Sequence, residues 1–131
     1  MLKIFAFATL MLSFSAAADQ SCAELQNMEA KMNADTPRKI EEGTELVQVK
    51  INCETRIVTY SKRLLAPATS LAPGAKERKQ RQHTQLHCNR TGVSSTMHWT
   101  AVDTLYDVDY KYIFTLTTAP ADCLAGIGQS E

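Results

Sequence analysis

The sequence lacks an excess of charge of either sign. Its 14 basic and 14 acidic residues give a formal net charge of zero. Overall balance of this kind gives no support for nucleic acid or an acidic surface as the partner, and we predict that the protein does not bind nucleic acid. The 131 residues contain no internal repeat and no low-complexity stretch, and this length fits one domain.

Recognisable catalytic motifs are also missing. The chain has no Gly-x-Ser-x-Gly elbow and no glycine-rich phosphate loop. It has no Cys-x-x-Cys pair, the close spacing from which structural zinc sites usually draw their ligands. We therefore predict a protein that is not an enzyme and that needs no cofactor.

Long hydrophobic runs are absent after the N-terminus. Residues 1–18 combine an early lysine, a short apolar stretch and small residues at Ala16 and Ala18. This order is typical of a secretory signal peptide, and the apolar run is short of the roughly 20 residues that a membrane span needs. We expect cleavage after Ala18 and a single domain over 19–131 that does not span a membrane, with a loose tail from about residue 124.

The sequence does contain four cysteines: Cys22, Cys53, Cys88 and Cys123. An even number of cysteines in an exported chain indicates disulfides, here two bridges at most. Three pairings are possible from the sequence. Bridged cysteines leave no free thiol as a nucleophile, and they would support a domain whose core is small.

The pattern of apolar residues predicts a helix, a hairpin, a second helix and a second hairpin. We assign the helices to 22–33 and 75–88 and the strands to 44–52, 55–64, 96–103 and 110–118. Val47, Val49 and Ile51 alternate with polar residues as in a half-buried strand. The second helix is unusually polar. The order predicts an α+β fold, with helices packed on one face of a four-stranded antiparallel sheet.

Two sets of side chains are candidate binding surfaces. A basic patch on and after the second helix comprises Lys76, Arg78, Lys79, Arg81 and Arg90. It suits an anionic partner such as a phospholipid headgroup, lipopolysaccharide or an acidic protein, or it is a solvated helix face. The second hairpin carries the aromatic residues Trp99, Tyr106, Tyr110 and Tyr112. At strand spacing, these are either core residues and cross-strand pairs or a ligand platform.

His83 and His87 lie four residues apart on the second predicted helix. This spacing lets two imidazoles meet one metal ion, but no glutamate follows His83 as in zinc proteases. The residues are either exposed helix histidines or ligands of a small metal-dependent hydrolase, with His98 on a different strand. Asp103 and the nearby acidic residues are interpreted as turn residues, because no closing glutamate completes a calcium loop.

A series of short motifs runs through most of the chain: Pro37, Ile40-Glu41-Glu42, Thr44-x-Leu46, Tyr60, Cys88, Tyr110–Leu116 and Asp122-Cys123. In these features the chain resembles a family of small exported bacterial proteins of unassigned biochemical role, which includes a quorum-sensing-regulated virulence factor. The resemblance supplies no catalytic residue. If the layout holds, Cys88 bridges Cys123 and Cys22 bridges Cys53, the second being a pair that looks added to the family pattern.

These features predict an exported, disulfide-stabilised binding or virulence-associated module, acting in the periplasm or outside the cell on a protein or an envelope component. Two alternatives stay open. One is a small metal-dependent hydrolase that uses His83, His87 or His98. The other is a structural protein of the envelope.

Overall fold

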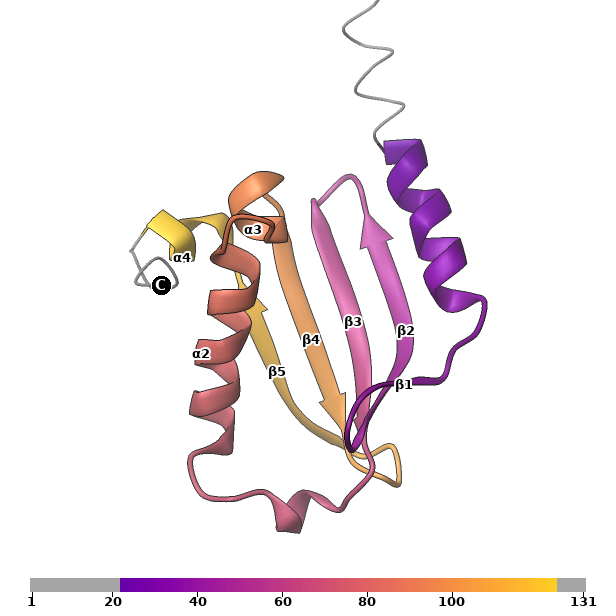
Figure 1. The fold of residues 1–131 in the computed structure, drawn as a ribbon, viewed down its shortest axis with the longest axis vertical. Helices are drawn as coiled ribbons and strands as arrows, with labels where there is room; N and C mark the ends of the chain where they lie inside the picture. The colour runs from indigo at the N-terminus through magenta and orange to yellow at the C-terminus, as the bar shows by residue number, and fades with distance from the viewer. Residues whose placement is uncertain (1–21, 125–131) are drawn as a thin grey trace, which may run out of the picture.

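A five-stranded mixed sheet is the centre of the computed structural model, which describes residues 22–124 (Figure 1). The strands are β1 (Arg38–Glu41), β2 (Thr44–Asn52), β3 (Ile57–Leu64), β4 (Thr100–Tyr106) and β5 (Tyr112–Thr118). An N-terminal helix covers 22–33, and it is followed along the chain by η1 (Ala68–Ser70), α2 (Ala75–Cys88), α3 (Val93–Thr96) and α4 (Pro120–Leu124). The predicted signal peptide and nearly all of the predicted tail lie outside the described residues. Within 22–124, no helix combines the length and the apolar character that crossing a membrane requires.

The sheet differs from the four-stranded antiparallel sheet that the sequence predicted. Its order is β1-β2-β3-β4-β5, and β3 and β4 run parallel while the other neighbours are antiparallel. The reason is α2, which carries the chain back along the sheet so that β4 starts at the same end as β3 (Figure 1). The short strand β1 was not predicted, because its sequence Arg-Lys-Ile-Glu shows no apolar alternation.

The third predicted strand also begins later than expected, at Thr100 instead of residue 96. The chain first forms α3, which follows Gly92 directly. A Cβ atom on Gly92 would lie 2.1 Å from the carbonyl oxygen of His87, so glycine is required for the chain to pass this close to the end of α2. β4 also ends later than predicted, at Tyr106 instead of residue 103, and this places Asp103 in the middle of the strand instead of in the hairpin turn.

The apolar core lies on one face of the sheet and is divided in two. One cluster contains Leu46, Val49, Val58 and Ala101, with Met32 of the N-terminal helix packed against it. The other contains Leu64, Leu105 and Leu116, with Leu71 and Phe114 beside it. On β4, the buried Asp103 stands between Ala101 of one cluster and Leu105 of the other. A band of polar residues therefore interrupts the core on the face that carries both long helices.

The predicted disulfide pairing is confirmed. Cys22 is bonded to Cys53, which ties the start of the described N-terminal helix to the turn between β2 and β3. Cys88 is bonded to Cys123, which ties the end of α2 to α4. The bridges close loops with sequence separations of 31 and 35 residues. By chain entropy, each bridge of this length stabilises the folded state by roughly 3–4 kcal/mol.

Side-chain amides occupy backbone groups of β5 and of the part of β2 that lies beyond its pairing with the short β1. Asn33 of the N-terminal helix donates to the carbonyl oxygen of Val49 (2.8 Å) and accepts from its N–H (2.7 Å). Gln80 of α2 makes the same pair of bonds with Thr117 of β5, at 2.9 Å and 3.2 Å. Each amide takes the place of a neighbouring strand residue and covers part of an edge that would otherwise be open to pairing.

Replacement of Asn33 tests this edge contact. Val49 is fully buried, so Asn33→Ala leaves a buried N–H and a buried C=O without their partner. We expect the free energy of unfolding to fall by about 1–3 kcal/mol, measured by urea denaturation with the disulfides intact. The control is Asn27→Ala, which removes an exposed asparagine from the same helix. Equal losses in the two variants would contradict the edge contact.

Candidate functional site

A groove runs over the sheet between the N-terminal helix and α2, and it consists of three adjoining clefts. The middle cleft has a volume of about 340 Å³ and opens between Met32 and Leu86, with Tyr60 and Asp103 in its floor. An apolar cleft of about 150 Å³ shares Met32 and Tyr60 with it and continues toward Trp99. A third cleft, of about 300 Å³, shares Leu86 and extends along α2 in the other direction.

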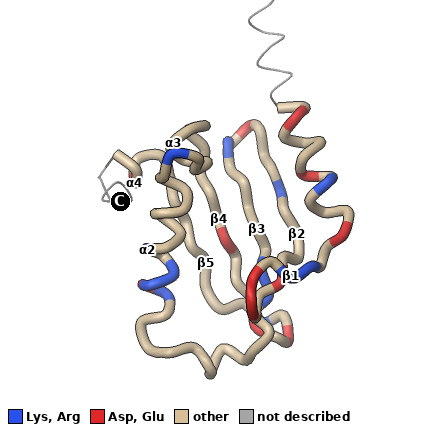
Figure 2. Tube along the Cα trace, in the orientation of Figure 1, with Lys and Arg blue, Asp and Glu red and all other residues tan. Residues whose placement is uncertain are grey.

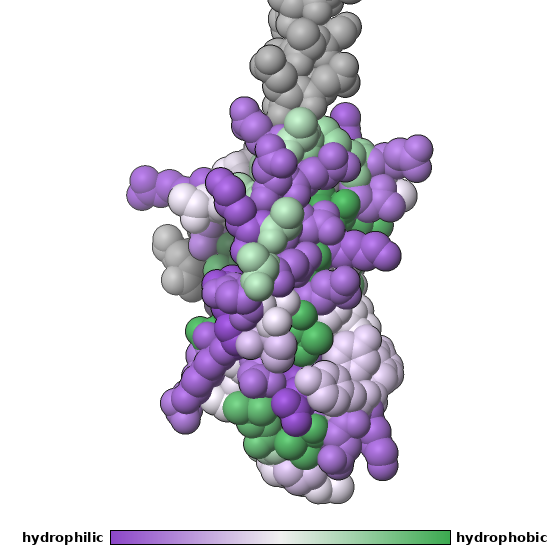
Figure 3. Space-filling model, turned by 90° about the vertical axis from the view of Figure 1, so that its right-hand side faces the viewer, coloured by the Kyte–Doolittle hydropathy of each residue, from purple (hydrophilic) through white to green (hydrophobic). Residues whose placement is uncertain are grey.

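Exposed hydrophobic side chains border this groove. Eight large hydrophobic residues in the described part of the chain are exposed, and four of them line the three clefts. These four are Met28 (52%), Ile40 (42%), Leu86 (56%) and Met97 (39%). Figure 3 views the side of the N-terminal helix and shows hydrophobic surface emerging between hydrophilic side chains. The gathering of apolar residues around one hollow marks a binding surface more than scattered exposure would.

The polar floor of the groove is built around the carboxylate of Asp103. Its Oδ2 atom lies 2.6 Å from the Lys62 ammonium, and its Oδ1 atom lies 3.3 Å from Nε2 of His83. Burial by itself raises the pKa of the Asp103 carboxyl, but His83 and Lys62 outweigh it and hold that pKa below its ordinary value. Asp103 is therefore ionised at neutral pH, and Lys62 balances its charge.

His83 is held by its other ring nitrogen. Nδ1 lies 2.7 Å from the hydroxyl of Thr118, whose backbone carbonyl accepts from Ser94. Nε2 approaches Oδ1 of Asp103 to 3.3 Å, close enough for attraction if the ring is protonated, but the direction of approach makes no hydrogen bond. Both atoms are buried and lack a hydrogen-bond partner, which is unusual for polar atoms in a core.

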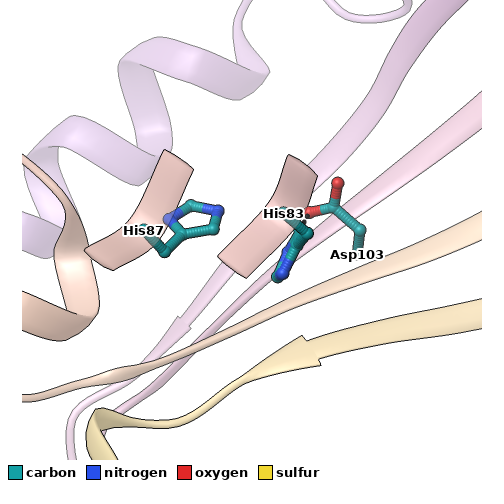
Figure 4. A group of neighbouring side chains, drawn as sticks. All are labelled: His83, His87 and Asp103. Atoms are coloured by element: carbon teal, nitrogen blue, oxygen red, sulfur yellow. Dashed lines mark ion pairs between the residues drawn. The ribbon is translucent and has the colours of Figure 1, made fainter. Parts of the chain in front are cut away.

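His87 completes the cluster one helical turn further along α2. Its ring centroid is 4.5 Å from that of His83, and Figure 4 shows both rings beside Asp103. Desolvation, supported by the neighbouring His83 and Lys62, lowers the pKa of His87 from 6.5 to about 4, although Asp103 acts in the opposite direction. The imidazole is therefore neutral at neutral pH. One nitrogen or oxygen atom from each of His83, His87 and Asp103 lies within 4.8 Å of the others.

The structure places the predicted histidines partly as the sequence suggested. His83 and His87 do share one face of α2, but they are buried instead of exposed. His98 is exposed in the loop before β4 and is not part of their cluster. Asp103 was assigned to a turn and is the residue that sequence reasoning missed. Its position in the sequence could have indicated burial, because Asp103 alternates with Ala101 and Leu105, two residues that point into the core.

The predicted basic patch divides into two places. Lys76, Arg78, Lys79 and Arg81 occupy the first two turns of α2, whereas Arg90 follows the other end of that helix. Figure 2 shows these Lys and Arg residues as separate regions of the chain. Arg78 also donates to the carbonyl oxygen of Pro73. The five residues do not form one continuous surface.

The aromatic residues of the second hairpin are likewise not gathered at one site. Trp99 lines the apolar cleft near the N-terminal helix. A register shift in the pairing of β4 and β5 sets Tyr112 opposite Tyr106, while Phe114 pairs with the core residue Leu105. This bulge turns the Tyr106–Tyr112 pair, whose rings meet edge to face, away from the core face. Tyr110 stacks over the guanidinium of Arg63.

Two solved structures share this fold. One, from Pseudomonas aeruginosa, is described as a candidate secreted protein. It has a TM-score of 0.62 and 12% identity, and the match covers 77% of this chain and 90% of that chain. The other is the pilotin of the Vibrio vulnificus type 2 secretion system, with a TM-score of 0.58 and 14% identity over 74% and 86% of the two chains.

No protein-family pattern and no curated protein matches the sequence. The resemblance to the quorum-sensing-regulated family is therefore supported only in its coarser sense, that of a small exported protein. At these identities, the solved structures establish a common fold and no common activity. The two disulfides and the likeness to a candidate secreted protein are consistent with export.

The lowered pKa of His87 predicts that acid destabilises the protein. Between the unfolded pKa of 6.5 and the folded pKa of about 4, the unfolded chain binds a proton that the native chain does not, so stability falls as pH falls. The groups that face His87 are His83, Asp103, Lys62 and Tyr60. We expect the loss of stability from about pH 7 to about pH 5 to be smaller in His87→Gln than in the wild type.

The measurement is urea denaturation of metal-free protein at each pH. The exposed His98 provides the matched control, since His98→Gln should leave the pH dependence at its wild-type value. A His87→Gln variant with the full wild-type dependence would show that His87 is not the group responsible.

Proposed function

We propose that the chain is an exported binding module without catalytic activity, which acts in the periplasm or outside the cell. In this proposal, the groove between the N-terminal helix and α2 takes an amphipathic helical segment of an envelope protein. The observation that carries it is the alignment of Met28, Ile40, Leu86 and Met97 along a single groove.

The chemistry of the groove favours an amphipathic partner. Exposed apolar side chains around a hollow gain free energy when a complementary apolar face covers them. Two of the four are methionines, whose flexible side chains adapt to differently shaped partners. A helix laid between two helices and over a sheet is one of the recurring ways in which proteins recognise peptides.

The backbone pairing of the sheet favours a helical segment over an extended one. An extended segment binds by adding a strand to a free sheet edge. Here Asn33 already occupies the free N–H and C=O of Val49, and Gln80 occupies those of Thr117. A helix satisfies its own backbone groups and needs only side-chain contacts from the groove.

The comparison with solved structures supports a partner in the envelope. One protein with this fold is a pilotin of a type 2 secretion system, and the other is described as a candidate secreted protein. The split basic patch gives less support to an anionic surface as the main partner, because the last two turns of α2 separate Arg90 from the other four cations.

Photo-crosslinking in the producing cell tests this proposal. A crosslinking amino acid is placed at Leu86 or Met28 in the groove, or at Leu65, an exposed leucine (43%) that does not line the three clefts. We expect both groove positions to crosslink to the same amphipathic segment of one envelope protein, and Leu65 to give no such product. Mass spectrometry of the crosslinked peptides identifies the segment.

A synthetic peptide of that segment then gives the binding constant. We expect Met28→Glu and Leu86→Glu to weaken its binding about tenfold or more, because each replaces an apolar contact by a carboxylate that loses water on binding. Leu65→Glu is the control and should bind as the wild type does. Equal crosslinking from all three positions, or equal binding by all variants, would refute the groove as the binding surface. A large stable oligomer of the free chain would instead favour a structural role in the envelope.

A further inference from the structure

We propose that His83, His87 and Asp103 form a binding site for a divalent transition-metal ion, and that this ion is Zn²⁺. Two imidazoles and a carboxylate are a donor set that zinc uses in proteins, with a fourth position left to water or another ligand. The proposal does not depend on the partner of the groove, since it concerns the free chain.

The ligand atoms come from two rigid elements. His83 and His87 are one turn apart on α2, and Asp103 lies in the middle of β4. One ligand atom from each lies within 4.8 Å of the others, whereas ligands around a tetrahedral zinc ion are about 3.4 Å apart. We expect rotations of the side chains to close this difference when the ion binds.

Two buried polar atoms of the cluster have no hydrogen-bond partner, and a cation or a proton between them would stabilise both. Nε2 of His83 and Oδ1 of Asp103 lack hydrogen-bond partners and face each other at 3.3 Å, and the side chains are only 2% and 6% exposed. In the tautomer whose proton is on Nδ1, beside the hydroxyl of Thr118, a lone pair of Nε2 faces a lone pair of the Asp103 carboxylate, and the two repel each other. A metal ion bound by both would turn this repulsion into two coordinate bonds.

The atoms around the cluster suit the orientation of metal ligands. A ligating histidine usually donates its second ring N–H to a neighbouring acceptor, and Nδ1 of His83 lies 2.7 Å from the hydroxyl of Thr118. This contact leaves the electron pair of Nε2 free for the ion. The second carboxylate oxygen of Asp103 is paired with Lys62 at 2.6 Å, so Oδ1 is the oxygen available to the ion.

The ion has a route to the site and room for a further ligand. Asp103 and His87 line the middle cleft of the groove, and His83 lines the cleft next to it. The Lys62 ammonium acts against the ion, because it brings a positive charge close to the same carboxylate. Zinc affinity should therefore fall when a ligand is removed and rise when the Lys62 charge is removed.

The experiment is calorimetric titration of metal-free full-length exported protein with zinc chloride. We expect one saturable site per chain. His87→Gln and the isosteric Asp103→Asn should weaken zinc binding about 10–100-fold, because each removes a ligand. Lys62→Met should bind zinc more tightly than the wild type, since the opposing charge is gone. Thermal unfolding gives the second readout: zinc should raise the Tm of the wild type and not that of Asp103→Asn.

His98→Gln is the control, because it removes an exposed histidine outside the cluster. Its zinc binding should equal that of the wild type. Circular dichroism and disulfide mapping check that each variant is folded. Zinc binding that is absent, or that survives both His87→Gln and Asp103→Asn, would overturn the site, and so would binding that is lost in His98→Gln. Unaltered or weaker binding in Lys62→Met would overturn the assignment of Asp103 as a ligand.

Discussion

Helix α2 is held on the sheet by polar contacts and a disulfide, and the groove depends on this attachment. Its buried residues are His83, Thr84, His87 and Cys88, while its leucine, Leu86, points outward. A net hydrogen bond contributes about 0.5–1.5 kcal/mol, less than the roughly 1.5–3 kcal/mol of a buried leucine. The Cys88–Cys123 bridge ties the end of α2 to α4 and, by restricting the unfolded chain, stabilises the folded state by roughly 3–4 kcal/mol, more than any one of these hydrogen bonds. With the disulfide present, the one leucine of α2 is available to border the groove.

The polar band beneath α2 is not the arrangement that stability alone favours. An apolar residue in place of Asp103 would join the two halves of the core between Ala101 and Leu105. A buried carboxylate costs several kcal/mol of desolvation, which an ion pair with Lys62 offsets only in part. Buried polar groups whose atoms are left unpaired are most often found where a site binds something. The band lies in the floor of the groove, where such a role has direct access to a ligand.

Local patterns in the sequence were sufficient for the two long helices and for most of the strands, but not for the short helices α3 and α4 or for the arrangement of the sheet. Apolar alternation placed β2 at its observed bounds, and helix-forming residues did the same for α2. The parallel pairing of β3 and β4 is set by the crossing of α2 over the sheet, a long-range feature that no local pattern contains. Asp103 was missed for a related reason. The predicted strand ended at Asp103, whereas β4 continues to Tyr106 and holds Asp103 between the buried residues Ala101 and Leu105.

The groove and the sheet edges together restrict how a partner can recognise this chain. Asn33 and Gln80 occupy the free backbone groups of Val49 in β2 and Thr117 in β5, which favours recognition through side chains at these two positions. Along the groove, an apolar end near Met28 and Trp99 gives way to the charged floor at Lys62 and Asp103. A wholly apolar helix would leave this floor covered and without water, at a cost in desolvation. A helix with a polar or metal-ligating side chain at its middle avoids that cost. The polar band therefore favours such a helix over one whose residues are all apolar.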